Sequence, residues 1–523
     1  MTRKGNKVQR RTGESGTAVE VTADRKAWKA VLWMFAAGVA GALLLAGCKS
    51  EEEFARDVGL SRKAAYRQWE KREARDEALQ PRISGKLSVE DTLKLTLANN
   101  KMLQRTLEEQ DVAYGAKVSS RSAYLPSVTL SGEYRRLDET SSFEFPDPNT
   151  GESQKLQAGD VDNYSVLLNV TQPIYAGGAI SARVRAARLL SLFSNQMVRA
   201  ATQDVIYAVQ TAYYDLLLSQ HLVEISVDAV RSAEAHLEDV EKRRAGGVAS
   251  DFDVLRAQVE LSNFEADLTR AKNAIDISRA NLIKIMGVSQ DSDFSLSDEF
   301  VFLPIDVSME AAVEAAFTNR PDLYRQEYQI RQQREQLRLA RSRYLPTFGA
   351  FFDQTWARPD PKAFISTDIQ WGDTWQAGFR GAWAIFDGFQ REGEIIQHRA
   401  RLRQAQIDLV DVEETAVFEL TGALLTMENA KEFIQSQRLN LTRATEGLRL
   451  AELGYEQGIY TQVEMIDAQA ALTTARANYY QAIHAHVVAK LALQRAMGTI
   501  LLEHRMDPSV AEASAEGTVD STE

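Results

Sequence analysis

The chain has 523 residues, with 61 Lys and Arg against 73 Asp and Glu, so its formal net charge at pH 7 is −12. This acidic balance argues against nucleic acid as a partner, because the phosphate backbone attracts basic surfaces. The single cysteine excludes an intramolecular disulfide, and only one long apolar segment is present, which argues against a helical membrane bundle.

The first predicted element is an export signal at residues 1–47. Eight Lys and Arg lie within residues 1–30, and an apolar run follows at 31–47 and ends directly before Cys48. A cysteine at this place is typical of a bacterial lipobox, in which the thiol becomes diacylated. The run of 17 residues is at the short limit for a transmembrane helix, so an uncleaved anchor is the alternative. We predict a lipid-anchored segment at 48–86, and removal of the signal leaves a net charge of −17.

The remainder of the chain is a tandem duplication. Three markers recur: RSAYLP returns as RSRYLP 220 positions later, and both IYAGG (as IFDGF) and IMG (as AMG) return 211 positions later. Such long self-similarity favours a symmetric scaffold over a catalyst. We predict a first structural repeat at 87–288, a linker at 289–306 and a second repeat at 307–502.

Each repeat contains a predicted β-hairpin, at about 127–173 and 347–386, and helices are expected before the hairpin of the first repeat. Apolar residues alternate with polar or small ones in both, from Tyr164 to Val170 and from Trp375 to Ile385. Strands of about ten residues cross an outer membrane when tilted. A soluble β-sandwich alternates in the same way, so the pattern alone leaves both open. The segments between the strands, 138–160 and 358–373, are polar and are expected to be loops.

Each repeat continues as a predicted long helical hairpin, at 178–288 and 388–498. The first arms, 178–244 and 388–454, contain no proline. Their apolar residues recur at heptad spacing and predict coiled-coil packing. These residues are Val205, Val209, Ala212, Leu216, Val223, Val227, Val230 and Leu237 in the first arm, and Val410, Val417, Leu420, Leu424, Met427, Ile434, Leu441 and Leu448 in the second.

Glycines and capping residues mark the turns of both helical hairpins. Gly246 and Gly247 end the first arm of repeat one, and Gly458 ends that of repeat two. Ser250 and Thr461 are placed to cap the returning helices.

Four strands cannot close a barrel, because an open edge in lipid leaves backbone groups unsatisfied. Closure therefore needs several chains. The predicted fold is mostly α with a transmembrane β-barrel. Three copies of the duplicated strand-hairpin and coiled-coil unit would form a 12-stranded β-barrel on a 12-helix α-barrel.

The duplicated YLP and I-[YF]-x-G markers, together with AYYDLL at 212–217, resemble the TolC-type outer-membrane efflux factors over about residues 87–502. The lipobox resembles the lipidated multidrug-efflux members. The resemblance implies a homotrimeric channel-tunnel in the outer membrane of a Gram-negative bacterium. It would extend into the periplasm, close at a periplasmic iris and export small molecules. The implied partners are a periplasmic adaptor, an inner-membrane pump of the RND type and outer-membrane lipid, with no cofactor.

In that family the second hairpin tip carries an aromatic residue, a glycine turn and two acids one helical turn apart. Tyr455, Gly458, Glu464 and Asp467 match this order. The resemblance implies that the two acids form the pore gate, and Asp253 stands at the first-repeat position of Glu464. The implied tip-turn and adaptor-contact residues are Gly246, Gly247, Ser250, Tyr455, Gly458 and Thr461. The alternative is that these acids are ordinary charges at a helix start, where they suit the helix dipole.

The sequence departs from the founding member at Tyr460, where that member has an arginine in its closed-tip latch. It also contains no recognisable catalytic constellation. His484 and His486 are two residues apart and do not share a helix face, so no metal site is expected. We found no phosphate-binding glycine loop and no His–carboxylate pair at a useful spacing.

We therefore predict that the protein is not an enzyme. A hydrolase using Glu464 and Asp467 is disfavoured, because exposed acids lack the burial that tunes their pKa. The alternatives that stay open are a type I secretion exit duct and a periplasmic coiled-coil structural lipoprotein without a channel. The acidic tail at 503–523 is predicted to be disordered.

Overall fold

The computed structural model describes residues 55–62, 65, 69, 71, 82–146, 151, 153–158, 160–300, 302, 305–362 and 370–500. Two compact units are distinguished, 1–79 and 80–523. In the first unit, residues 55–62 are helical. The predicted signal peptide, Cys48 and the acidic tail lie outside the described residues.

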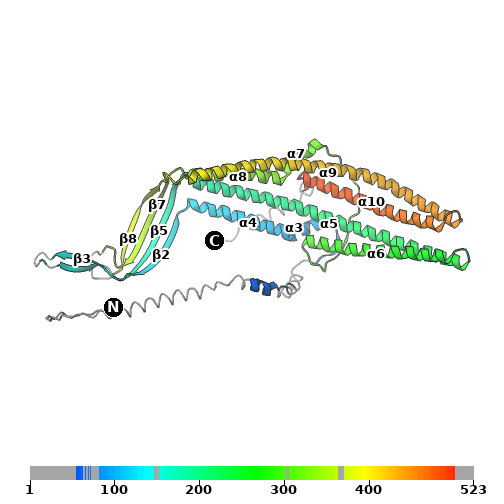
Figure 1. Ribbon diagram of the computed structural model, residues 1–523, viewed down its shortest axis with the longest axis horizontal. Helices are drawn as coiled ribbons and strands as arrows, with labels where there is room; N and C mark the ends of the chain where they lie inside the picture. Colours follow the sequence, from blue (N-terminus) through cyan, green and yellow to red (C-terminus); the bar gives the residue numbers. More distant parts are fainter. Residues whose placement is uncertain are drawn as a thin grey trace, which may run out of the picture. The chain divides into compact units, whose positions relative to one another are not determined.

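The second unit carries the duplicated elements (Figure 1). In chain order these are β1 (Ser84–Leu87), α3 (Val89–Asn99), α4 (Lys101–Arg121), the 3-10 turn η1 (Ser122–Tyr124), β2 (Ser127–Arg136), β3 (Ser141–Pro146), β4 (Ser153–Ala158), β5 (Asp162–Ala176), α5 (Ala179–Ala245), α6 (Asp251–Met286), β6 (Asp293–Leu296), α7 (Met309–Asn319), α8 (Pro321–Ser342), β7 (Thr347–Arg358), β8 (Gly372–Ala382), α9 (Gln390–Glu456) and α10 (Gln462–Ala496). Among these described helices, none is both long and apolar enough to cross a bilayer.

The two predicted hairpins form one antiparallel sheet in the order β2-β5-β7-β8. The β5–β7 pair joins the repeats, and β2 and β8 are the two edges. Strand alternation separates an apolar face from a polar face. The apolar face carries Val128, Leu130, Tyr134, Val166, Leu168, Val170, Phe348, Phe352, Trp356, Trp375 and Phe379.

Strand β8 ends at Ala382, so the prediction that Trp383 and Ile385 continue its alternation was wrong. A side chain takes the place of a partner strand here. The guanidinium of Arg391 donates to the carbonyls of Ala384 (2.9 Å) and Ile385 (3.1 Å). These hydrogen bonds stabilise the corner between β8 and α9. The alternating pattern in the sequence continues through this corner, although the strand does not.

The predicted loop at 138–160 contains a second, small hairpin, β3–β4. Its register sets Phe143 opposite Leu156 and Phe145 opposite Gln154. The surrounding Pro, Gly and Asp residues obscured this short alternation in the sequence. The segment 289–306, expected to be a linker, likewise contains β6, which pairs in parallel with β1.

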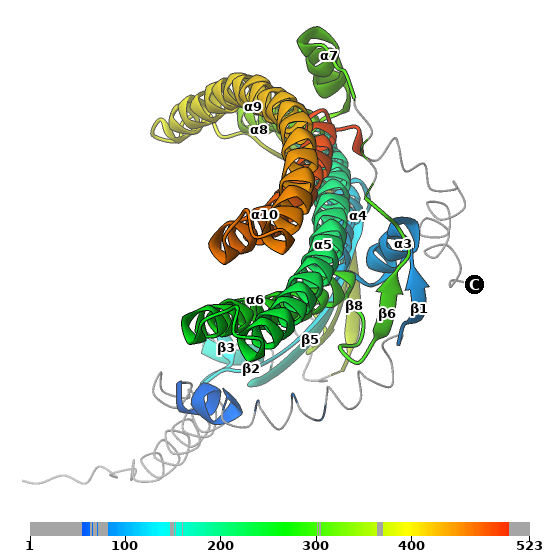
Figure 2. The same ribbon diagram turned by 90° about the vertical axis from the view of Figure 1, so that its right-hand side faces the viewer.

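Helices α5 and α9 have 67 residues each, which confirms the two long arms. The sheet lies at one end of these helices and the hairpin turns at the other (Figure 1). Helix α5 contacts α4 and α6 of its own repeat as well as α8 and α10 of the other. Figure 2 shows α6, α5, α10 and α9 following an arc.

The heptad residues of α5 form much of the core, but those of α9 are divided. Leu420, Met427 and Ile434 are buried, whereas Val410 and Val417 are 51% and 36% exposed. The coiled-coil packing predicted from the heptads is therefore formed only in part within the single chain. The heptad pattern identifies the apolar side of α9. Within the described residues, other helices of the chain cover only a portion of that side.

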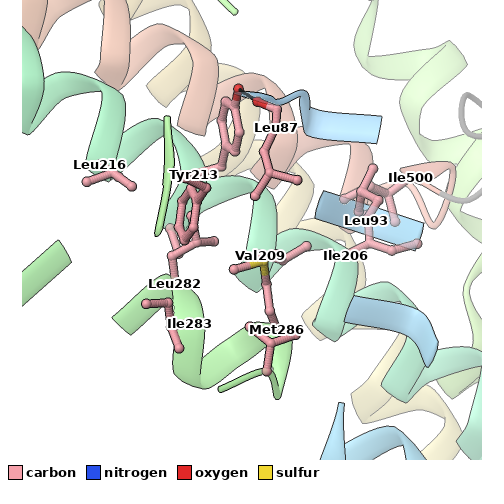
Figure 3. Close-up of a cluster of buried hydrophobic side chains, with 13 residues drawn as sticks. Leu87, Leu93, Ile206, Val209, Tyr213, Leu216, Leu282, Ile283, Met286 and Ile500 are labelled. Carbon is pink, nitrogen blue, oxygen red and sulfur yellow. Dashed lines mark hydrogen bonds between the residues drawn. The ribbon is translucent and has the colours of Figure 1, made fainter. Parts of the chain in front are cut away.

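The largest core cluster joins α5 and α6 to β1 and α3 (Figure 3). Tyr213, from the AYYDLL marker, is fully buried there. Its hydroxyl lies 3.0 Å from the Leu87 carbonyl and 2.8 Å from the Asp298 carboxylate, and it can donate to either. Burial and then Asp298 raise the pKa of Tyr213, so the phenol stays protonated and keeps its proton for one of these two acceptors.

Candidate functional site at the helical hairpin tips

Glycine turns close both helical hairpins. Gly246 is the C-cap of α5, and Gly247 follows with φ +76°. In the second hairpin Gly458 has φ +73°. These left-handed backbone angles strain any residue with a Cβ, which explains why glycine occupies both turns.

A capping box begins each returning helix. The Ser250 hydroxyl accepts from the Asp253 N–H at 3.2 Å, while the Asp253 carboxylate accepts from the Ser250 N–H at 2.9 Å. Thr461 and Glu464 repeat the arrangement, and the Thr461 N–H donates to Glu464 at 2.7 Å. Each pair satisfies two backbone donors that a helix start otherwise leaves open. Asp253 and Glu464 are thus equivalent in structure as well as in sequence.

These bonds keep both carboxyls ionised. The backbone N–H of Ser250, followed by its hydroxyl, lowers the pKa of Asp253. Thr461 lowers the pKa of Glu464 through the same two groups. Glu464 therefore carries a full charge whose oxygens are directed back to the start of α10.

Asp467 lies one helical turn further along α10 and is exposed. It takes no part in the capping box, unlike Glu464. Its counterpart in the first repeat, Arg256, lies with its guanidinium 5.9 Å from the ring of Phe252. The two tips therefore share the cap and differ in charge one turn later.

A set of aromatic and polar contacts joins the two tips. The Arg243 guanidinium lies 4.5 Å from the ring centroid of Tyr455 and forms an ion pair with Asp239 at 2.7 Å. His236 contacts the Gln462 amide at 3.2 Å, and the same amide donates to the Asp253 carbonyl at 3.0 Å. Sequence reasoning missed His236, Arg243 and Gln462, because their partners are far away in the chain.

A cavity of about 380 Å³ lies between the hairpins near these contacts. His236 and Arg243 of α5, Phe264 of α6, Tyr455 of α9 and Met465 of α10 are among its lining residues. Burial lowers the pKa of His236, so the imidazole favours its neutral form and acts as a hydrogen-bonding group. Tyr460, the residue that departs from the founding member, packs over Gly454, where a Cβ would lie 2.2 Å from its ring.

The histidines outside the tips have structural contacts. His484 Nε2 lies 2.7 Å from Asp215 and connects α10 to α5. Spacing along the sequence could not reveal this pair, because 269 residues separate His484 from Asp215. His486 is buried against Phe302, with ring centroids 4.6 Å apart. Over the described part of the chain, no cluster of three or more His, Cys, Asp or Glu residues could hold a metal ion.

The chain matches the family described as "Outer membrane efflux protein" over residues 92–288 and 312–499. It is 23% identical to the outer membrane protein TolC of Vibrio cholerae, across 78% of this chain and 90% of that protein. It is 20% identical to the alkaline protease secretion protein AprF of Pseudomonas aeruginosa, across 74% and 80%.

The fold also matches that of the CmeC outer membrane channel of Campylobacter jejuni. The TM-score is 0.66 at 16% sequence identity, with 83% of this chain and 90% of that chain covered. These findings confirm the resemblance drawn from the duplicated markers. The chain belongs to the outer membrane efflux protein family and is an efflux channel of the Gram-negative outer membrane that extends into the periplasm.

Proposed function

We propose that three copies of the chain close into one duct, with a 12-stranded β-barrel above a 12-helix α-barrel. The supporting observation is the four-stranded sheet, whose edge strands β2 and β8 each have no partner on their outer side among the described residues. One face of this sheet is apolar and aromatic, as a lipid-facing surface requires. In lipid, each unpaired backbone group costs several kcal/mol, so both edges need partner strands.

Exposed apolar side chains on the helices support the same assembly. Phe418 on α9 is 78% exposed, and Val112 on α4 is 74% exposed. The large apolar side chains on these two helices that are more than half exposed are Met102, Val112, Tyr114, Val118, Ile396, Ile407, Val410, Phe418, Leu425 and Leu439. Such a concentration of exposed apolar residues is typical of an interaction surface, and a neighbouring copy would cover it.

For the iris, we propose that Asp467 is the main selectivity residue in each chain. Its carboxylate is exposed and lies outside the capping box. Glu464 and Asp253 would add negative charge while they hold the helix starts. Carboxylates gathered in a narrow passage favour cations.

The hairpin tips are the proposed contact region for a periplasmic adaptor, with the inner-membrane pump, of the RND type, beyond it. Gly246, Gly247 and Ser250 form one tip, and Tyr455, Gly458 and Thr461 form the other. Small molecules are the proposed cargo. Similarity to a protease secretion protein favours a type I secretion exit duct as the second candidate, and recovery of the partner pump would separate the two.

Conductance in planar lipid bilayers tests the proposed duct. The purified full-length protein should produce discrete, cation-selective channel openings. A periplasmic structural lipoprotein would leave the membrane resistance unchanged, and this result would contradict the proposal.

A further inference from the structure

Two constant offsets, of 220 and 211 residues, relate the first repeat to the second. The pairing registers of the strands are consistent with both offsets. Ser127 of β2 pairs with Thr171 of β5. The residues 220 and 211 positions later, Thr347 of β7 and Ala382 of β8, pair in the second hairpin. One offset therefore relates β2 to β7, and the other relates β5 to β8.

Helix junctions obey the same offsets. Asn100 donates its side-chain amide to the Ile285 carbonyl at 2.8 Å. Arg320, 220 positions after Asn100, donates to the carbonyl of Ala496, 211 positions after Ile285, at 3.1 Å. The duplication thus reproduces individual contacts even where the side chains differ. A contact between the repeats can therefore be carried over to the equivalent boundary between two copies of the chain.

The seam between repeats is the β5–β7 pair, in which Asn169 lies opposite Asp353. Their side chains are hydrogen-bonded at 2.5 Å on the polar face of the sheet. The residue 211 positions after Asn169 is Arg380, on the β8 edge. The residue 220 positions before Asp353 is Glu133, on the β2 edge. An amide–acid pair inside the chain thus corresponds to a base and an acid on its two free edges.

A glycine at the sheet–helix corner supplies independent evidence. A Cβ on Gly177 would lie 2.5 Å from the Ser342 carbonyl oxygen and 2.8 Å from the Leu345 Cβ. The equivalent Gly388 has open space around it within the described part of the chain. Ser122 and Leu125, 220 positions before Ser342 and Leu345, are the equivalent neighbours, and they lie beside the β2 edge. A second copy of the chain would place its Ser122 and Leu125 next to Gly388.

We infer that β8 of one copy pairs antiparallel with β2 of the next, in the register that sets Arg380 opposite Glu133 and Ala382 opposite Ser131. This inference rests on the proposed trimer and specifies its boundary. In the single chain both side chains are exposed, and their contacts are local. Glu133 lies 4.0 Å from Arg135, and Arg380 lies 4.9 Å from the ring of Phe351.

Charge selects this register over its neighbours. A slip of one residue would turn the apolar face of β8 toward the polar face of β2. A slip of two in one direction would set Arg380 opposite Arg135, and like charges directly opposite each other destabilise a strand pair. A slip of two in the other direction would set Arg380 opposite Ser131 and leave Glu133 without its partner. The inferred register is the one that joins opposite charges at each boundary.

Cysteine crosslinking in the full chain, purified from outer membranes, tests this register. Ser131→Cys with Ala382→Cys should produce disulfide-linked dimers and trimers on a non-reducing denaturing gel. The matched control is Ser131→Cys with Gly378→Cys, which places the second thiol on the same strand and face but four residues away. This control should stay monomeric on the same gel, as should the unsubstituted chain. Crosslinking of the control pair instead would overturn the register while leaving the trimer intact.

The charge pair is tested by reversal and rescue. Arg380→Glu should lower the temperature at which the trimer dissociates, and the addition of Glu133→Arg should restore most of the loss. An unchanged dissociation temperature in Arg380→Glu would overturn the pairing. If the unsubstituted protein forms no trimer by light scattering, the proposed function itself fails, and that outcome is distinct from a wrong register.

Discussion

Helices α5 and α9 have the same length but different surroundings. Helix α5 is covered within the chain, and ion pairs connect it to the other repeat, including Arg185–Glu335 at 2.9 Å and Asp204–Arg495 at 2.8 Å. At the equivalent positions, α9 carries Ile396 in place of Arg185 and Thr415 in place of Asp204. The seam within one chain thus has charges at these two positions, whereas α9 has uncharged residues there. Permanent interfaces between chains are typically more apolar than other protein surfaces, so this difference is the one expected if a second copy covers α9.

The largest expected effect comes from breaking that apolar surface. Tyr207 of α5 lies 5.1 Å from the Arg495 guanidinium. Phe418 lies 211 positions after Tyr207, and Lys284 lies 211 positions before Arg495. By this equivalence, Phe418 would face Lys284 of the next copy. Phe418→Asp should abolish the trimer, because a well-packed interface residue contributes about 2 kcal/mol or more at each boundary.

The control for this prediction is Phe418→Leu, which keeps an apolar side chain and should still form trimers. Native gels and light scattering would measure both variants. A fully trimeric Phe418→Asp protein would show that this face of α9 is not a boundary between copies.

A smaller effect should separate the two corner glycines. Both Gly177 and Gly388 have positive φ, +59° and +68°, so alanine strains either backbone by about 1–2 kcal/mol. Gly177→Ala adds a clash inside the chain to this strain and should lower the stability of the protein. Gly388→Ala should reduce trimer stability by more than the backbone strain alone explains. Thermal unfolding of the trimer measures both variants, and a loss in Gly388→Ala no larger than the backbone strain would show that no neighbouring chain fills the space beside Gly388.

Short-range patterns predicted much of the fold, because the residues that cause them are close together in the sequence. The proline-free stretches 178–244 and 388–454 located α5 and α9 to within about two residues, and Ser250 and Thr461 begin capped helices as expected. The β1–β6 pair was not predicted. It sets Leu87 opposite Leu296, and no periodic pattern within a short segment indicates a contact between residues so far apart in the sequence.

The candidate site was predictable to a lesser degree for the same reason. The turn glycines and the two capping acids were visible as local motifs. The contacts that join the tips, such as His236 with Gln462, require two hairpins to meet in space. The exposure of Val410 and Val417 depends on which partner covers α9, and periodicity carries no information about that partner.

At the tips, Glu464 and Asp467 are both proposed to supply negative charge to the passage. The double change Glu464→Gln and Asp467→Asn should weaken cation selectivity and relieve block by multivalent cations, since it removes the proposed ring charges. Trimer stability should change little, because glutamine also serves at this capping position. Single-channel recordings would measure the effect, and unchanged selectivity and block would return both acids to the role of ordinary charges at a helix start.

The capping box also predicts a local pH dependence. Because the folded-state pKa of Glu464 is lowered, its contribution to the helix start is complete above the ordinary glutamate pKa and is lost as the pH falls through the lower folded value. The protection of the amides at 461–465 against hydrogen exchange, relative to their intrinsic rates, should therefore fall in acid. Glu464→Ala should remove this pH dependence, and persistence of the dependence in that variant would argue against the cap as its source.

The smallest effect on assembly is expected at Cys48, the proposed lipidation site. Cys48→Ser should abolish diacylation and slow delivery to the outer membrane, while the sheet's apolar face still favours insertion into lipid. Labelling with radioactive palmitate would measure the change. Equal incorporation into both proteins would refute the lipid assignment.

The number of chains in the folded particle tests the central proposal most directly. Light scattering of the detergent-purified protein, corrected for bound detergent, should give the mass of three chains, because β2 and β8 each need a partner strand and α9 needs a partner surface. A stable particle with the mass of one chain, the native helical content and an intact sheet would contradict this account.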